Sequence, residues 1–148
     1  MQIALDIADA VVTELNGAPA ETFSQTFTAV RRVLALFASD DKAYRNLTVI
    51  VAPAKVDIDI GVRGAGQYNV MVEIGVLKKL TTDDLDTEIE AMMAFVQEIV
   101  LYMRRLPLAG QPEAKWLTTG NEPIYSPEHL HQARVFLSKI QLTYVVYL

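Results

Sequence analysis

Hydrophobic and polar positions follow two different periods along this chain, and together they predict strands mixed with helices. Residues 55–60 and 68–76 alternate strictly between apolar and polar side chains, which is the period of a half-buried β-strand. We expect these neighbouring segments to form an antiparallel pair with one face toward water. The glycine-rich segment 61–66 between them is longer than a tight hairpin and predicts a mobile connection.

Helical spacing occurs in two segments. Residues 2–16 carry apolar side chains at helical spacing, with enough of them to predict a wide face that packs on a sheet and on a second partner. The strongest prediction is a helix over 82–105, with Thr81 or Thr82 as its N-cap. Its apolar residues step by three and four: Leu85, Ile89, Met92, Val96, Ile99 and Met103.

Three further segments have the composition of strands. Residues 23–33 are rich in Phe, Thr and Val, which favours a strand, although 31–36 fits a helix equally well. Residues 47–51 predict a short strand that ends before Pro53. A further short strand is expected at 116–119.

The last quarter of the chain predicts a short helix and a long strand. Ser126 precedes Pro127, so we expect Ser126 to cap a helix that begins at Pro127 and ends near Ala133. The strand expected at 136–147 has no charge after Lys139. A long uncharged strand would aggregate at an open edge, so it is central in the sheet or covered by another subunit.

The order of these elements predicts one α+β domain over residues 1–148. We expect a mainly antiparallel or mixed twisted sheet. It packs against the N-terminal helix and one long central helix, and a short third helix completes the fold.

Composition excludes several kinds of site. The chain has no cysteine, which excludes disulfides, thiol nucleophiles and thiolate metal sites. Its net charge is −5 and its pI is near 5.0, a poor match to a protein that wraps nucleic acid. The N-terminal segment lacks the features of a signal peptide, and no run approaches the roughly 18 apolar residues of a membrane span. We expect a soluble intracellular chain without a membrane partner.

One acidic constellation suggests metal chemistry. Asp57 and Asp59 share a strand face, and we expect Glu73 opposite them on the next strand. Three carboxylates on a sheet suit a divalent metal and nuclease chemistry. Lys78, however, lies five residues after Glu73, and this odd separation places the two on different faces of the strand. A hydrated outer face is the favoured interpretation.

Other candidate chemistry is weaker still. Ser126 and His129 have no evident carboxylate to orient the histidine, so they do not predict a catalytic dyad. Trp116 and Tyr125 suit a binding surface, since aromatic residues anchor interfaces, and Trp116 fits a core position equally well. We therefore predict no catalytic residue, no metal site and no cofactor.

Short motifs are spread over nearly the whole chain. They are Phe23-Ser24-Gln25-x-Phe27, the apolar strand 47–53, Arg63 with Gln67-Tyr68, Glu73-Ile74-Gly75-Val76-x-Lys78-Lys79, residues 92–96, and Glu122-Pro123-Ile124-Tyr125-x-Pro127-Glu128-His129-Leu130. The last is the most specific, because two prolines and an aromatic residue recur at fixed spacing. Together these motifs resemble those of a small protein from the tail-assembly region of long-tailed phages and prophages.

The element order is also similar to that of tail terminator proteins, the lambda-like minor tail protein U group. This resemblance implies a structural, non-enzymatic subunit of a homohexameric ring in the neck of the virion, assembled in the host cytoplasm. Its implied partners are copies of itself, the tail tube protein and a head-completion or stopper protein, with genomic DNA only passing through. Residues 34–38 depart from the expected turn after the first strand, which leaves the contacts of that region open.

Two groups of residues are candidates for roles in such a ring. Carboxylates repel phosphate, so Asp57, Asp59 and Glu73 are candidates to line the DNA channel. Three alternatives to a tail terminator remain open: another neck component, a small metal-dependent nuclease and a cytosolic adaptor. Candidates for the subunit or tube interface are Val62, Arg63, Gln67, Trp116, Glu122, Ile124 and Tyr125.

Overall fold

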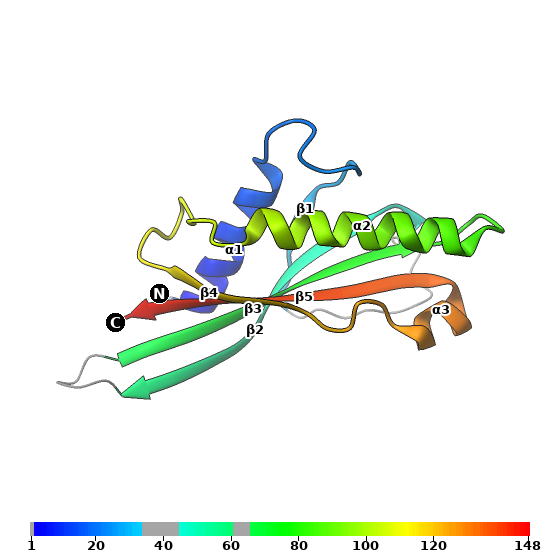
Figure 1. Cartoon of the computed structure of the whole chain (residues 1–148). Coiled ribbons are helices and arrows are strands. Elements are labelled where there is room, and N and C mark those ends of the chain that lie inside the picture. The colour runs from blue at the N-terminus through cyan, green and yellow to red at the C-terminus, as the bar shows by residue number, and fades with distance from the viewer. Residues whose placement is uncertain (1, 34–44, 61–65) are drawn as a thin grey trace.

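The protein folds as a five-stranded sheet with three helices in a computed structural model that describes residues 2–33, 45–60 and 66–148 (Figure 1). Strand order is β1-β2-β3-β5-β4, with β1 parallel to β2 and every other neighbouring pair antiparallel. This mixed sheet confirms the predicted α+β class. The elements are α1 (Ile3–Asn16), β1 (Ala29–Arg31), β2 (Thr48–Ile60), β3 (Gly66–Lys79), α2 (Leu85–Met103), β4 (Lys115–Asn121), α3 (Pro127–Ala133) and β5 (Val135–Tyr147).

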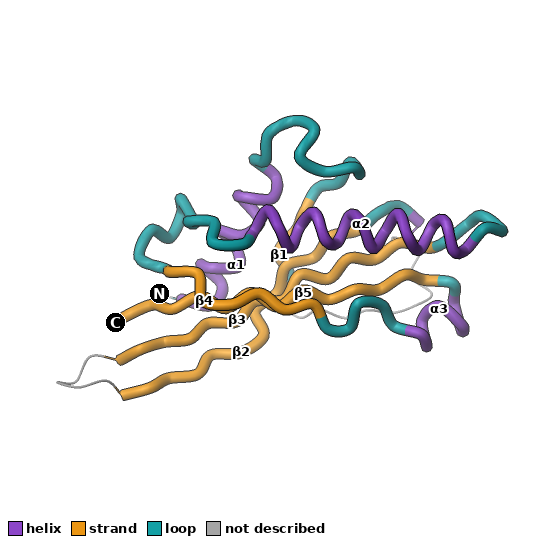
Figure 2. Tube along the Cα trace, in the orientation of Figure 1, coloured by secondary structure: helices purple, strands orange, loops and turns teal. Residues whose placement is uncertain are grey.

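Both longer helices lie on one face of the sheet, seen above it in Figure 2. α1 packs against β1, β2 and β3, while α2 lies over β5 and β4. The main core forms between the helices and this face. Its largest fully buried side chains include Ile7, Ile74, Phe95, Ile99, Phe136, Ile140 and Tyr144.

The register of β2, β3 and β5 assigns each alternate residue to a face. Val70, Val72 and Ile74 of β3 are buried in the main core, whereas Met71 and Glu73 between them lie on the opposite face, which we call the outer face. The predicted antiparallel pair with one wet face is therefore confirmed. A small apolar cluster of Ile50, Leu77 and Leu137 also lies on the outer face.

The two predicted long helices are present. α1 matches the prediction closely, but α2 begins at Leu85 and not at residue 82. Its N-cap is Asp84, whose carboxylate accepts a hydrogen bond from the backbone N–H of Thr87 at 3.3 Å. The prediction of Thr81 or Thr82 as the cap is wrong, because the backbone N–H of Thr82 donates instead to Glu88 at 2.8 Å.

The predicted strand at 23–33 is largely wrong, since β1 has only three residues. Phe23 and Phe27 lie in the connection before it and pack edge-on against Phe95 of α2, with ring centroids 6.1 and 5.2 Å away. The Phe-rich composition therefore reflects an aromatic cluster with α2 and not a strand.

β2 is a single strand, where the sequence predicted one strand ending before Pro53 and another at 55–60. A β-bulge between Pro53 and Lys55 shifts the register and lets the strand continue. Proline is tolerated at bulges and sheet edges because its missing N–H then removes no ladder hydrogen bond.

The C-terminal predictions are confirmed. α3 has Ser126 as N-cap and Pro127 as its first residue, and β4 extends the predicted strand at 116–119. β5 lies between β3 and β4, so the uncharged strand is central. No helix in the described part of the chain combines the length and apolar character needed to cross a membrane. Residues 34–38, whose contacts the sequence left open, and nearly all of the segment 61–66 lie outside the described residues.

Candidate functional site

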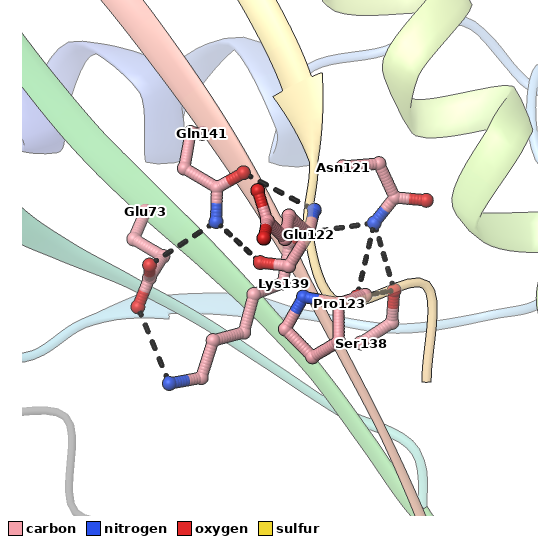
Figure 3. Close-up of polar contacts among 7 residues, drawn as sticks. All are labelled: Glu73, Asn121, Glu122, Pro123, Ser138, Lys139 and Gln141. Atoms are coloured by element: carbon pink, nitrogen blue, oxygen red, sulfur yellow. Dashed lines mark hydrogen bonds and ion pairs between the residues drawn. The ribbon is translucent and has the colours of Figure 1, made fainter. Parts of the chain in front are cut away.

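A polar network crosses the outer face from β3 to the end of β4 (Figure 3). Gln141 of β5 is at its centre: its Nε2 donates to Glu73 Oε2 at 3.3 Å and to the backbone oxygen of Glu122 at 2.8 Å. Its Oε1 accepts from the backbone N–H of Glu122 at 3.2 Å. The ammonium of Lys139 lies 3.8 Å from Glu73 Oε1. The side chain of Gln141 thus links β5 to β3 and to the residue that follows β4.

Asp57, Asp59 and Glu73 all lie on the outer face, but they are not clustered. Asp57 pairs with Asn69 and Asp59 with Gln67. The expectation that Glu73 lies opposite the two aspartates is wrong, because the register pairs Glu73 with Ala52 of β2. Glu73 lies four positions after Asn69 along β3, which at ~3.3 Å per residue is about 13 Å.

This separation bears on the nuclease alternative. Among the described residues no three His, Asp or Glu side chains come close enough to hold a metal ion. Asp57 instead pairs with Lys55 at 3.1 Å, and Glu73 with Lys139. The carboxylates described on the outer face are thus dispersed along two strands, and two of them are paired with lysines.

The connection from β4 to α3, residues 121–127, lies against β5. Asn121 holds it there: its Nδ2 donates to the backbone oxygen of Lys139 at 2.7 Å and to Ser138 Oγ at 3.0 Å. The backbone N–H of Ser126 donates to the Leu137 oxygen at 3.0 Å. Ile124, between these anchors, is 51% exposed. Both ends of the connection are therefore fixed while its apolar tip faces solvent.

An apolar groove runs between this tip and α2. It has a volume of about 440 Å³ and is lined by Met93, Ala94 and Val100 of α2, with Ile124 opposite. Glu90 lies at its wall. Methionine at such a surface adapts to different partner shapes. The groove is thus a mainly apolar concave surface at the end of the edge strand β4, where Asn121 also lines it.

The predicted interface residues fall into two places. Glu122, Ile124 and Tyr125 meet in the connection after β4, and all three are exposed. Gln67 begins β3 on the outer face beside Asp59, where its Nε2 donates to Asn69.

Trp116, Val62 and Arg63 do not join these groups. Trp116 is half-buried against the main core, and its Nε1 donates to Thr119 Oγ1 at 2.8 Å. Val62 and Arg63 lie outside the described residues.

Ser126 and His129 are in contact, although the sequence predicted no dyad. Ser126 Oγ lies 2.8 Å from His129 Nδ1 and also caps α3. No carboxylate contacts the histidine among the described interactions, so the pair lacks the third group that orients a catalytic base. Its geometry is that of a helix cap.

Sequence reasoning missed two features of this region. Asn121 looked like an ordinary loop residue, and only its three acceptors reveal its anchoring role. Met93 has no role assigned from the sequence, yet its side chain is 37% exposed and lines the groove. Its position next to Met92, off the three-and-four spacing, was the available signal.

Comparison with protein-family models and with curated proteins found no match.

Proposed function

We propose that this protein is a structural, non-enzymatic subunit of the neck of a long-tailed phage. In this proposal it forms a homohexameric ring that caps the tail tube, ends tube polymerisation and connects the tube to the head-completion or stopper protein. The observation that carries the proposal is that, among the described residues, the sheet has two unlike edges with no further strand and with exposed apolar side chains beside them, which suits head-to-tail association of identical subunits. The specific assignment to the tail terminator group rests on the resemblance of the sequence motifs to a tail-assembly protein and of the element order to tail terminators.

The outer face supports a second part of the proposal. Asp57, Asp59 and Glu73 lie on this one face of the sheet. Lys55 pairs with Asp57 and Lys139 with Glu73, so the face carries mixed charge and has little net attraction for phosphate, which suits a wall that DNA passes without sticking. We propose that this face lines the channel of the ring.

The oligomeric state tests the ring. Light scattering over a concentration series, followed by negative-stain imaging, is expected to show a discrete sixfold ring, formed alone or on addition of tube protein. A monomer that ignores tube protein contradicts the proposal. A ring that binds the head side and leaves tube growth unaffected favours another neck component. Mg²⁺-dependent DNA cleavage that Asp57→Ala abolishes favours the nuclease.

Charge reversal tests the channel. We expect Asp57→Lys with Asp59→Lys to slow DNA delivery by phage assembled with the variant, because a basic wall binds phosphate. The control is Asp83→Lys with Glu113→Lys, which makes the same change in net charge at exposed positions away from the outer face. Equal DNA delivery by the two double variants contradicts the channel assignment.

A further inference from the structure

In the part of the chain that the structure describes, neither edge of the sheet is covered by a further strand, and the two edges differ from each other. β1 pairs only with Val49–Val51 of β2, so residues 54–60 of β2 have no described strand on that side. At the other edge, β4 pairs with β5 alone. In Figure 1 the far ends of β2 and β3 project beyond the helices at the lower left. Open strand edges present unpaired N–H and C=O groups to a further strand.

The two edges are compatible in length and direction. β4 has seven residues, and the section of β2 beyond its pairing with β1, 52–60, is long enough to pair along all of β4. Along the sheet, β2 and β5 run one way while β3 and β4 run the other. If a second copy continues the sheet with the same face toward its helices, its β2 lies antiparallel to the first copy's β4. Antiparallel pairing is the more stable arrangement per residue.

The charges on the outer face agree with this direction. Along the open section of β2 the charges run from Lys55 to Asp59, and along β4 from Lys115 to Glu122 just beyond its end. Antiparallel pairing places Lys55 near Glu122 of the other copy and Asp59 near its Lys115. Parallel pairing would place like charges together, which is destabilising across strands. Topology and charge therefore select the same orientation.

The apolar side chains on the other face match as well. Val56 and Ile58 pair with Val70 and Tyr68, so they lie on the helix-covered face, yet they are 37% and 59% exposed. On the receiving side, the groove between α2 and Ile124 opens beside β4 on that same face. A strand added to β4 brings its apolar face alongside this groove, which removes apolar surface of both copies from water.

We infer that residues 54–60 of β2 add as an antiparallel strand to β4 of a second copy, with Val56 and Ile58 covering the groove beside α2. This contact specifies how the subunits of the proposed ring join, and the closure of the ring rests on the proposed function. Because the two surfaces differ, each copy offers one and receives the other, which generates a ring when the rotation closes. The β-bulge at β4 between Trp116 and Thr118, together with the charges, limits pairing to a matching partner.

Cysteine crosslinking tests the contact, and the chain has no cysteine of its own to interfere. The double variant Ile58→Cys with Leu117→Cys, treated at millimolar protein with a short bismaleimide, is expected to give a ladder of linked copies. Each single variant is expected to give little dimer, since identical surfaces do not meet. The control pair Thr26→Cys with Leu117→Cys is expected to remain monomeric. A double variant that yields only monomer overturns the inference, because irreversible coupling captures even weak association.

Charge exchange tests the direction of pairing. Lys55→Glu and Glu122→Lys, each alone, are expected to weaken self-association several-fold, and the two combined to restore it. Analytical ultracentrifugation measures the dissociation constants. Failure of the combined variant to recover overturns the antiparallel register. Failure of the two proposals is distinguishable: a sixfold ring without the 58–117 crosslink overturns this contact alone, whereas absence of any ring overturns the proposed function.

Discussion

Replacing Asn121 with aspartate removes the donors that hold the connection after β4 while leaving the shape of the side chain unchanged. The Asn121 amide faces three acceptors: the backbone oxygens of Lys139 and Pro123 at 2.7 and 3.4 Å and Ser138 Oγ at 3.0 Å. A carboxylate cannot donate to them, and it places negative charge against two carbonyl oxygens. Asn121→Asp is therefore expected to loosen the connection.

The loss follows from the hydrogen bonds. An amide NH2 makes at most two full bonds, each contributing about 1 kcal/mol net, and partners left unsatisfied cost a further 1–2 kcal/mol or so. We expect Asn121→Asp to lower the free energy of unfolding by about 2–4 kcal/mol. Urea unfolding followed by far-ultraviolet circular dichroism measures this, and Trp116, the only tryptophan, gives a fluorescence signal from β4.

The control is Asn46→Asp. Asn46 is exposed, and only its backbone oxygen makes a described hydrogen bond, so the same substitution there is expected to change stability by less than about 0.5 kcal/mol. If Asn121→Asp also falls within about 0.5 kcal/mol of the unaltered protein, the anchoring role of Asn121 is refuted.

Three further predictions concern side-chain packing, a buried hydroxyl and a side chain that binds the backbone. Phe95→Ala removes the ring against which Phe23 and Phe27 pack and is expected to lower the free energy of unfolding, measured by thermal unfolding, by about 3–5 kcal/mol. Met93→Ala, on the exposed side of α2, is expected to lower it by less than about 1 kcal/mol. Equal losses contradict the assigned burial. The buried hydroxyl of Tyr144 has no partner among the described residues, and burial raises its pKa. The folded protein therefore favours the neutral phenol. Its contribution to folding stability is fully present below pH ~10, the usual pKa of tyrosine, and is lost as the pH rises above it. Tyr144→Phe is expected to raise stability at pH 7 by about 1 kcal/mol and to reduce the alkaline loss; lower stability at pH 7 contradicts this. Asn16 makes two hydrogen bonds to the backbone of Ala29, so Asn16→Asp is expected to cost about 1–2 kcal/mol in urea unfolding, and an unchanged midpoint contradicts it.

Elements whose burial depends on one repeating face were predictable from the sequence. Alternation in β3 and the three-and-four spacing of α2 reflect which side chains meet the main core, and both appear in the structure. Ser126 and Pro127 define the start of α3 through local chemistry alone. Such signals lie within a short stretch of chain, so they can be read without knowing the partner.

Features that depend on distant partners were not predictable. Phe23 and Phe27 look like strand residues until Phe95 is known to receive them. The bulge at Pro53 depends on how β2 pairs with β3. The positions of Asp57 and Glu73 on one face followed from alternation, but their separation depended on a register that no single strand specifies.

The central position of β5 also determines the order in which this sheet can be built. β4 precedes β5 in the chain, and β5 is its only described strand partner. During synthesis, β4 therefore has no strand to pair with until β5 has left the ribosome, while β2 and β3 can already pair. Joining β3 to β5 closes a long stretch of chain that includes α2, β4 and α3, and such distant pairings slow folding. The half of the sheet that carries the groove is thus completed last, and the surface that receives a second copy forms only when nearly all the described chain is in place.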